Sequence, residues 1–271
     1  MSNGTTELAS GKLVLDRPAE AVARLAIRNP GKRNAMDHEI LDGIATAMDE
    51  LDNGIETRCV IITGSEGMFS AGYDIGDIPD EVFAQEAERL VAHPFSRAIE
   101  AVERFPFPTL AVINGHALGG GLELAVTCDL RVAAKDVKLG MPPAKLGLIY
   151  SHTGLQKFLD TVGPARTREL FFVGHNVTGE RAEQIGLVNE AVSREEVEDY
   201  AVALAAEIAG NAPVSLKGNK RIITELLNFP RLSETLEREV IQLRLSSFQT
   251  EDFREGVRAF GEKRKPRWQG R

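Results

Sequence analysis

The decisive stretch of this chain is N-G-H-A-L-G-G-G-L-E, residues 114–123. An apolar, β-branched run at 110–113 precedes it and a helix-like apolar run at 122–126 follows, so its three glycines lie where a strand gives way to a helix. The first N–H groups of a helix have no partner within that helix, and glycine lets a ligand approach the backbone closely. Such donors beside the carboxylate of Glu123 suit chemistry in which negative charge develops on a carbonyl oxygen.

Composition and charge narrow the class of protein. A chain of 271 residues accommodates one large domain or a domain with an appendage. Its net charge of -8 argues against nucleic acid or an anionic membrane surface as the main partner. The first residues lack the apolar core of a signal peptide, and no apolar run is long enough to cross a bilayer. Because Cys59 and Cys128 form no CxxC pair, we expect reduced thiols in a cytoplasmic protein.

Strands and helices alternate in the first part of the chain, whereas helices alone follow Pro164. The hydrophobic pattern predicts strands at 13–15, 23–27, 60–63, 109–113, 130–133 and 137–139, with a turn at 16–18. It predicts helices at 36–51, 82–105 with a break at Pro94, 166–173, 179–185, 195–209, 213–227 and 232–248. This order indicates an α/β core at residues 1–195 and a helical region at residues 196–271.

Several nucleotide and hydrolase motifs are absent from the sequence. There is no G-x-G-x-x-G fingerprint, no phosphate-binding loop and no G-x-S-x-G nucleophile elbow. The five histidines lack metal-ligand spacing, so we expect no metal site. Glu123 is harder to dismiss. A surface glutamate in the first turn of a helix would only complement the helix dipole, but the run around Glu123 has the pattern of a buried helix, and a buried carboxylate without a function is costly.

A second loop of small residues, F-S-A-G-Y-D-I at 69–75, follows the strand at 60–63. Two such loops can present two backbone N–H groups to one oxygen. With these two segments the chain resembles the crotonase superfamily, the enoyl-CoA hydratase/isomerase family, from Leu13 to Gln269. Three more segments resemble the family's in the same order: N-P-G-K-R-N-A at 29–35, T-G-E-R-A-E-Q-I-G-L-V-N at 178–189 and F-G-E-K-R-K-P at 260–266.

The resemblance implies a fold, a substrate class and a site. The fold is a spiral of ββα units with a helical C-terminal region that builds homotrimers, often paired as dimers of trimers. The substrate is an acyl-CoA thioester, so coenzyme A is part of the substrate and no separate cofactor is expected. The backbone N–H groups of Tyr73 and Gly120 would form the oxyanion hole, and Glu123 would act as acid or base. The resemblance assigns the CoA site to Lys32, Arg33, Ala71, Asp74, Ile75, Phe260 and Lys263.

One segment departs from the family's hydratases. Their second glutamate falls, by spacing, at Pro143, which offers neither an acid nor a base. The segment with Pro143, Leu146, Gly147 and Tyr150 instead resembles the branch that contains methylmalonyl-CoA decarboxylase, although that enzyme has a histidine at the position of Tyr73. Tyr150 is therefore a candidate catalytic residue, with buried packing as the alternative interpretation. The ring of Tyr73 predicts a narrow acyl pocket.

The lone carboxylate leaves the reaction open. Double-bond isomerisation needs one group that moves a proton between carbons, and Glu123 suffices. Hydration with one carboxylate requires Tyr150 or His152 to place the water. Decarboxylation of a malonyl-type thioester forms the enolate by loss of carbon dioxide, without a base. We expect a hydratase/isomerase-type acyl-CoA enzyme with a single glutamate first, a decarboxylase of a methylmalonyl-CoA-like thioester second, and a CoA-binding protein without catalysis third.

Overall fold

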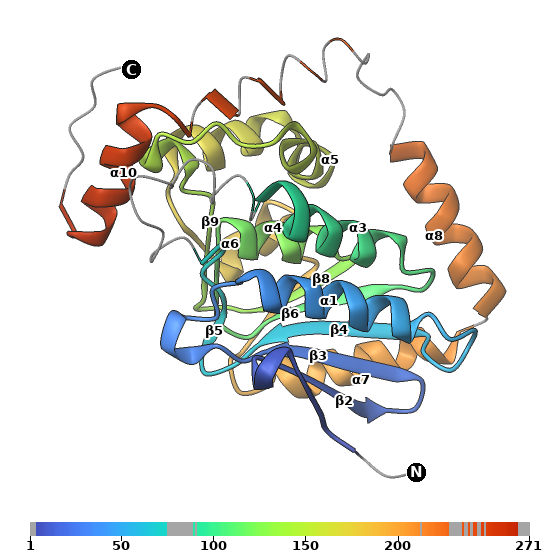
Figure 1. The fold of residues 1–271 in the computed structure, drawn as a ribbon. Helices are drawn as coiled ribbons and strands as arrows, with labels where there is room; N and C mark the ends of the chain where they lie inside the picture. The colour runs from blue at the N-terminus through green and yellow to red at the C-terminus, as the bar shows by residue number, and fades with distance from the viewer. Residues whose placement is uncertain are drawn as a thin grey trace.

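The computed structural model describes residues 4–74, 89, 91–211, 213–227, 235, 238, 241–242, 245–246 and 248–264. Two sheets form the centre, and helices cover both faces of the larger one (Figure 1). The larger sheet has the order β1-β2-β3-β4-β6-β8-β11 and is parallel from β3 to β11. Its strands are β1 (Thr6–Leu8), β2 (Leu13–Ala19), β3 (Val22–Ile27), β4 (Cys59–Gly64), β6 (Thr109–Ile113), β8 (Leu130–Ala134) and β11 (Glu190–Val192).

The smaller sheet has the order β10-β9-β7-β5. Its strands are β5 (Met68–Ser70), β7 (His116–Leu118), β9 (Lys138–Gly140) and β10 (Val177–Thr178). The prediction that the strand at 109–113 leads directly into the glycine turn is wrong, because β7 lies between them. A Cβ on Gly115 would lie 2.1 Å from the Gly67 carbonyl carbon, so only glycine lets the chain turn here and pair β7 with β5 and β9.

The helices follow the predicted pattern closely. In α1 the Asp37 side chain accepts from the Ile40 N–H as an N-cap, and the buried side of the helix includes Ile40, Ile44 and Met48. The helices are α1 (His38–Leu51), α3 (Ser96–Arg104), α4 (Gly120–Thr127), α5 (His152–Arg168), α6 (Gly179–Gln184), α7 (Val197–Gly210), α8 (Pro213–Leu227) and α10 (Glu251–Gly261). Shorter 3-10 or π turns are η1 (Ala9–Gly11), η2 (Pro30–Lys32), η3 (Val91–Phe95), η4 (Pro143–Leu146) and η5 (Glu169–Val173).

Two local predictions are corrected by the structure. The turn predicted at 16–18 is absent, since β2 continues to Ala19 and absorbs Pro18 in a register shift between Asp16 and Ala19. The chain reverses instead at Ala21, where φ is 55°. The helix predicted at 166–173 comprises the end of α5, which begins at His152 and has a non-helical Gly163 inside it, followed by the π turn η5.

The region predicted as a helix at 82–105 is described only in part. Pro94 lies in η3, a wider turn that leads into α3, and most of residues 75–90 lie outside the described residues. Most of the predicted helix at 232–248 lies outside them as well. The α/β class with a parallel sheet and a helical C-terminal part is confirmed. The prediction that helices alone follow Pro164 is wrong, because β10 and β11 lie beyond it and β11 pairs with β8 at the edge of the larger sheet. The boundary at 195/196 stays a prediction; α7, just beyond it, packs on β4 and β6.

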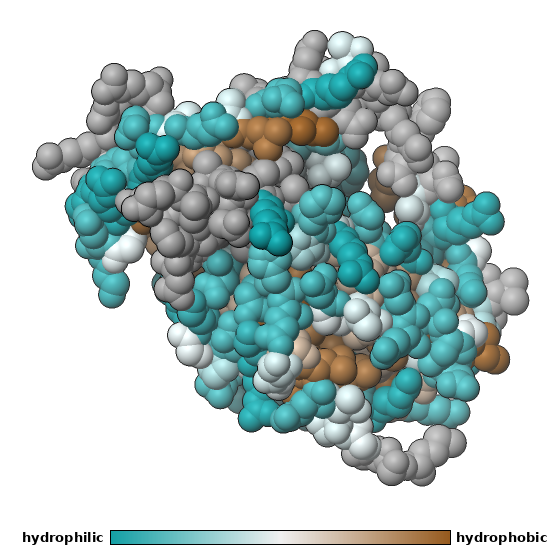
Figure 2. Space-filling view, in the orientation of Figure 1, coloured by the Kyte–Doolittle hydropathy of each residue, from teal (hydrophilic) through white to brown (hydrophobic). Residues whose placement is uncertain are grey.

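The surface is largely polar on the face shown in Figure 2, where hydrophobic residues form a band near the top of the view and a second patch below its centre. None of the helices within the described residues is long and apolar enough to cross a membrane. Large apolar side chains nevertheless reach the surface, among them Phe172, Ile222 and Phe260. An oligomer interface would cover such side chains, and the trimer remains a prediction.

Candidate active site

The glycine turn packs closely against the smaller sheet. Gly119, with φ 55° and ψ -127°, has a backbone conformation open only to glycine. Its N–H donates to the Gly140 carbonyl at 3.0 Å, and its carbonyl accepts from the Glu123 N–H at 3.0 Å. A Cβ on Gly121 would lie 2.5 Å from the Ser70 carbonyl oxygen, so β5 approaches α4 too closely for any other residue. The sequence prediction of a strand-to-helix turn is confirmed.

The two backbones predicted to form an oxyanion hole lie next to each other. A Cβ on Gly72, where φ is 98°, would lie 3.1 Å from the Gly120 nitrogen. Met36 donates to the Gly72 carbonyl at 2.8 Å and accepts from the Asp74 N–H at 3.0 Å, which makes a parallel bridge between Met36 and Tyr73. In this bridge the N–H of Tyr73 points away from Met36. The structure therefore brings together the two residues whose N–H groups the resemblance singles out.

Glu123 is buried and is bonded to phenol groups. Its side chain is 3% exposed, and the Tyr150 hydroxyl donates a short hydrogen bond to its Oε2. Burial raises the pKa of Glu123 to about 7, against the lowering effect of hydrogen bonds from Tyr150 and Tyr73. Burial also raises the pKa of Tyr150 well above its usual value, so this phenol stays a neutral donor. On the other side, a Cβ on Gly154 of α5 would lie 2.8 Å from the Glu123 Oε1.

Aromatic rings surround this carboxyl group. The rings of Tyr73 and Phe95 pack edge-on with 4.8 Å between their centroids. The rings of Tyr150 and Phe171 pack in the same way with 5.3 Å between their centroids. A Cβ on Gly120 would lie 2.7 Å from Cε1 of Tyr73, so the Tyr73 ring covers the first turn of α4. Apolar walls of this kind exclude water and strengthen each electrostatic interaction inside them.

The second carboxylate of a hydratase has no counterpart here. Pro143 is buried at the start of η4. Within the described part of the chain, Glu123 is the only buried acidic side chain. The same residues contain no group of three or more histidine, cysteine or acidic side chains that could hold a metal ion. The arrangement therefore offers one carboxyl group, two phenols and two backbone donors.

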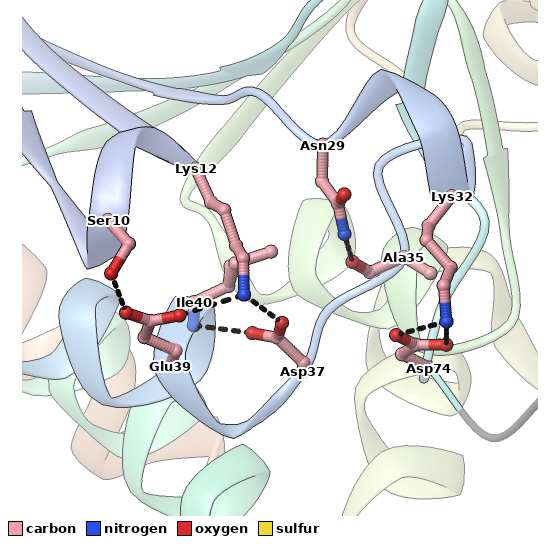
Figure 3. Close-up of polar contacts among 9 residues, drawn as sticks. All are labelled: Ser10, Lys12, Asn29, Lys32, Ala35, Asp37, Glu39, Ile40 and Asp74. Carbon is pink, nitrogen blue, oxygen red and sulfur yellow. Dashed lines mark hydrogen bonds and ion pairs between the residues drawn. The ribbon is translucent and has the colours of Figure 1, made fainter. Parts of the chain in front are cut away.

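The first two predicted CoA segments lie side by side (Figure 3). Lys32 of η2 contacts both carboxylate oxygens of Asp74 at 3.1 Å. The Ala71 N–H donates to the Arg33 carbonyl at 3.1 Å. The structure thus brings together Lys32, Arg33, Ala71 and Asp74, while Ile75 lies outside the described residues.

Sequence reasoning missed Asn34, which joins these two segments. Asn34 is fully buried with φ 55°, a conformation that asparagine tolerates better than most residues. Its Oδ1 accepts from the Asn29 N–H at 2.8 Å, and its Nδ2 donates to the Met68 carbonyl at 2.7 Å. Asn29 in turn donates to the Ala35 carbonyl at 2.9 Å (Figure 3). The asparagine in a Gly-Lys-Arg-Asn turn was the available signal.

The predicted C-terminal CoA residues form a separate group. Gly256 brings α10 against η4 so closely that a Cβ there would lie 2.5 Å from the Leu146 carbonyl. Phe260 is exposed on α10, and Lys263 follows the helix with φ 53°. Beside them is a hollow of about 290 Å³ that is lined by Ala144, Lys145, Phe172, Gly256, Ala259, Phe260 and Arg264. Their contribution to a CoA site stays a prediction.

Comparison with known proteins agrees with this geometry. The sequence profile of the enoyl-CoA hydratase/isomerase family matches residues 17–271. The chain belongs to this family. A Bacillus subtilis protein named "Probable enoyl-CoA hydratase" is 38% identical over 253 residues, which cover 92% of this chain and 95% of that protein.

Solved structures of the family superpose over almost the whole chain. A methylmalonyl-CoA decarboxylase in complex with 2-nitronate-propionyl-CoA has a TM-score of 0.87 and 27% identity, covering 96% of this chain and 99% of that one. An enoyl-CoA hydratase from Bacillus anthracis has a TM-score of 0.75 and 28% identity, covering 96% of this chain and 100% of that one. The chain is thus an enzyme of the enoyl-CoA hydratase/isomerase family, whose substrates are acyl-CoA thioesters.

Proposed function

We propose that the enzyme acts on its acyl-CoA thioester through an enolate. The N–H groups of Tyr73 and Gly120 bind the thioester oxygen, and Glu123 carries the proton. The observation that supports this most is the single buried carboxyl group, bonded to Tyr150 beside the glycine turn. Donors placed where oxyanion charge develops are worth about 2.7–4 kcal/mol each.

The reaction that fits the site best is decarboxylation of a 2-carboxyacyl-CoA. The bond from C2 to the carboxylate breaks, carbon dioxide leaves, and the electron pair enters the thioester as an enolate. C2 then takes the proton of Glu123, while Tyr150 holds the carboxyl group in place through its hydrogen bond to Oε2. An incoming substrate carboxylate disfavours the ionised form of Glu123, so the glutamate is loaded with a proton when the substrate is bound. The similarity to methylmalonyl-CoA decarboxylase supports this choice.

Double-bond isomerisation with a single glutamate is the second candidate. A pKa of about 7 leaves Glu123 ionised in a large fraction of molecules at neutral pH, as a base requires. The relatives named as enoyl-CoA hydratases support an enoyl-CoA substrate. Syn hydration is less suited to the site because Pro143 stands where the second acid would be.

The CoA moiety would extend from this site along the paired loops. Lys32 and Arg33 would meet its phosphates, and Ala71, Asp74 and Ile75 would line the adenine and pantetheine path. Phe260 and Lys263 would complete the site, from this subunit or from a neighbour in a trimer. Asp74 already holds Lys32, so the lysine side chain is ordered for this contact before CoA binds.

Three substrates and the pH dependence of turnover distinguish the candidate reactions. The protein is incubated with methylmalonyl-CoA, crotonyl-CoA and a 3-enoyl-CoA, with the Glu123→Gln variant as control. We expect carbon dioxide and propionyl-CoA from methylmalonyl-CoA, with a kcat/KM that falls above about pH 7 because the protonated glutamate is required. Turnover of the 3-enoyl-CoA alone, with a rate that rises through the same pH, would establish isomerisation instead. Binding of all three without turnover would leave a CoA-binding protein.

The ring of Tyr73 sets the expected acyl size. Because it covers Gly120 and packs on Phe95, the space beside the thioester is narrow. We expect Tyr73→Ala to widen chain-length tolerance, measured as kcat/KM for acyl-CoA esters of increasing length. A substrate profile that stays the same as in the wild type would show that the ring does not limit the pocket.

A further inference from the structure

An ion pair lies beside the helix that carries Glu123. Lys157 of α5 contacts Glu103 of α3 through its Nζ, and its side chain is only 14% exposed. Lys157 follows Gly154 by three residues, which puts both on one side of α5. Gly154 lies so close to Glu123 that a Cβ there would be 2.8 Å from Oε1. Both α3 and α5 pack on α4 (Figure 1). The pair therefore links the two helices on either side of the helix that carries Glu123.

Stability alone does not account for this pair. Exposed lysine–glutamate pairs contribute roughly 0–1 kcal/mol, and taking an ammonium group out of water has a desolvation cost. Neither Lys157 nor Glu103 has a part in the proposed enolate chemistry. What distinguishes the pair from the other ion pairs of α3 is its position one helical turn from the group that touches Glu123.

We propose that Lys157, anchored by Glu103, is a positioning residue that sets how readily Glu123 releases its proton, and thereby the pH range of turnover. The inference rests on the proposed role of Glu123 as the proton carrier. The positive charge of Lys157 favours the ionised form of Glu123, and the negative charge of Glu103 disfavours it. Because Glu103 also holds the lysine in place, the balance between the two charges is fixed by the packing of α3 and α5.

Other polar groups around α4 have partners of their own. Tyr73 and Tyr150 donate hydrogen bonds to Glu123, and burial, which raises the pKa of Tyr150, keeps that phenol protonated. Arg131, beyond the other end of α4, donates to the carbonyls of Cys128 and Leu187. The ring of His116 on β7 accepts from the Lys138 N–H.

The charges of the pair act on Glu123 in opposite directions. The two largest effects on the pKa of Glu123 are burial, which raises it, and the Tyr150 hydrogen bond, which lowers it. Of the two charges in the pair, the ammonium of Lys157 lowers this pKa and the carboxylate of Glu103 raises it. Removing one partner at a time therefore has effects of opposite sign, which loss of structural support would not produce.

The test is the pH dependence of kcat/KM in a double-mutant cycle. We expect Lys157→Met to move the midpoint up by roughly one pH unit and Glu103→Gln to move it down by less, with the double variant close to the wild type. Lys157→Arg keeps the charge and should restore the midpoint. The matched control is Arg104→Met. Arg104 follows Glu103 on α3, and both side chains of its ion pair with Asp49 are exposed to solvent.

Infrared spectra make the outcome independent of turnover. The carboxylic acid band that disappears in Glu123→Gln reports the protonation of Glu123 directly, in any variant that still folds. Midpoints that move in the same direction in Lys157→Met and Glu103→Gln, or that match Arg104→Met, would overturn the inference. If Glu123→Gln keeps wild-type activity, the proposed function fails instead, whatever the midpoints show.

Discussion

A buried ionisable side chain lies near each end of α4, and the two side chains have different kinds of hydrogen-bond partner. Glu123 in its first turn is 3% exposed, and Arg131 just beyond its last turn is 8% exposed. Both lie at the helix pole that favours their sign. Arg131 donates to backbone carbonyls, from Nε to Leu187 at 2.8 Å and from Nη1 to Cys128 at 2.7 Å. Glu123 is bonded instead to phenol side chains.

The partners decide what each charge does. Backbone carbonyls are fixed and accept only, so they hold the guanidinium in one place and one protonation state, although burial lowers the Arg131 pKa. Phenols can donate and can rotate, and burial brings the Glu123 pKa to about 7. The comparison teaches that a buried charge with backbone partners supports structure, whereas one with titratable partners is available for chemistry.

The largest expected effect is the loss of catalysis when Glu123, in the first turn of α4, is replaced. Glu123→Gln keeps the shape and the acceptor for Tyr150 but removes the transferable proton. We expect kcat/KM to fall about 10³-fold, within the range of general acid–base catalysis, while binding of a CoA product stays within about threefold. Steady-state kinetics and calorimetry measure the two quantities. A variant that loses binding and keeps kcat would assign Glu123 to the CoA site instead.

The second effect is a loss of stability when Arg131, beyond the last turn of α4, is replaced. Arg131→Met leaves the Leu187 and Cys128 carbonyls without their donor in a buried site, and each such loss costs about 1–3 kcal/mol. We expect the free energy of unfolding in urea to drop by about 3 kcal/mol. The kcat of the folded fraction should stay near that of the wild type. An unchanged stability with a reduced kcat would contradict the contrast between the two ends.

A third effect links Glu123 to stability through pH. Its native pKa, about 7, lies above the ordinary 4.5, so the native state holds the proton more tightly than the unfolded state. The group has no effect below pH 4.5, destabilises the fold increasingly as pH rises toward 7, and costs up to about 3 kcal/mol above that. We expect Glu123→Gln to gain stability relative to the wild type between pH 5 and pH 8, measured by urea unfolding. Glu169→Gln, at an exposed carboxylate, is the control that should show no such gain.

The smallest effect concerns the phenol. Tyr150→Phe removes the short hydrogen bond to Oε2, and this bond favours the ionised form of Glu123. We expect roughly a tenfold loss in kcat, since a hydrogen bond to a charged group is worth about 1.5–3 kcal/mol, together with a pH midpoint that moves upward. A midpoint at the wild-type value would show that Tyr150 packs beside Glu123 without acting on it.

Much of this comparison was visible in the sequence. The apolar residues at 122 and 124–126 predicted that Glu123 is buried, and the glycines at 119–121 predicted the turn. The helix of α8 was predicted with the bounds that the structure has. Local patterns suffice for such elements because their hydrogen bonds and apolar faces are encoded within a few residues.

Non-local contacts were beyond the sequence. β5 and β7 have three residues each, too few for a periodic pattern, and they are fixed by pairing with distant strands. Lys157 and Glu103 are 54 positions apart, and no local rule joins them. Tyr150 was recognised through a family resemblance, and only the structure gave its contact with Glu123.

The central claim is that Glu123 is a buried proton carrier poised near neutral pH. The most direct measurement is the carboxylic acid band of Glu123 in infrared difference spectra, wild type against Glu123→Gln, followed from pH 4 to pH 9. We expect the band to persist to neutrality and to disappear with a midpoint of about 7. A midpoint near 4.5, the value of an ordinary glutamate, would contradict the claim.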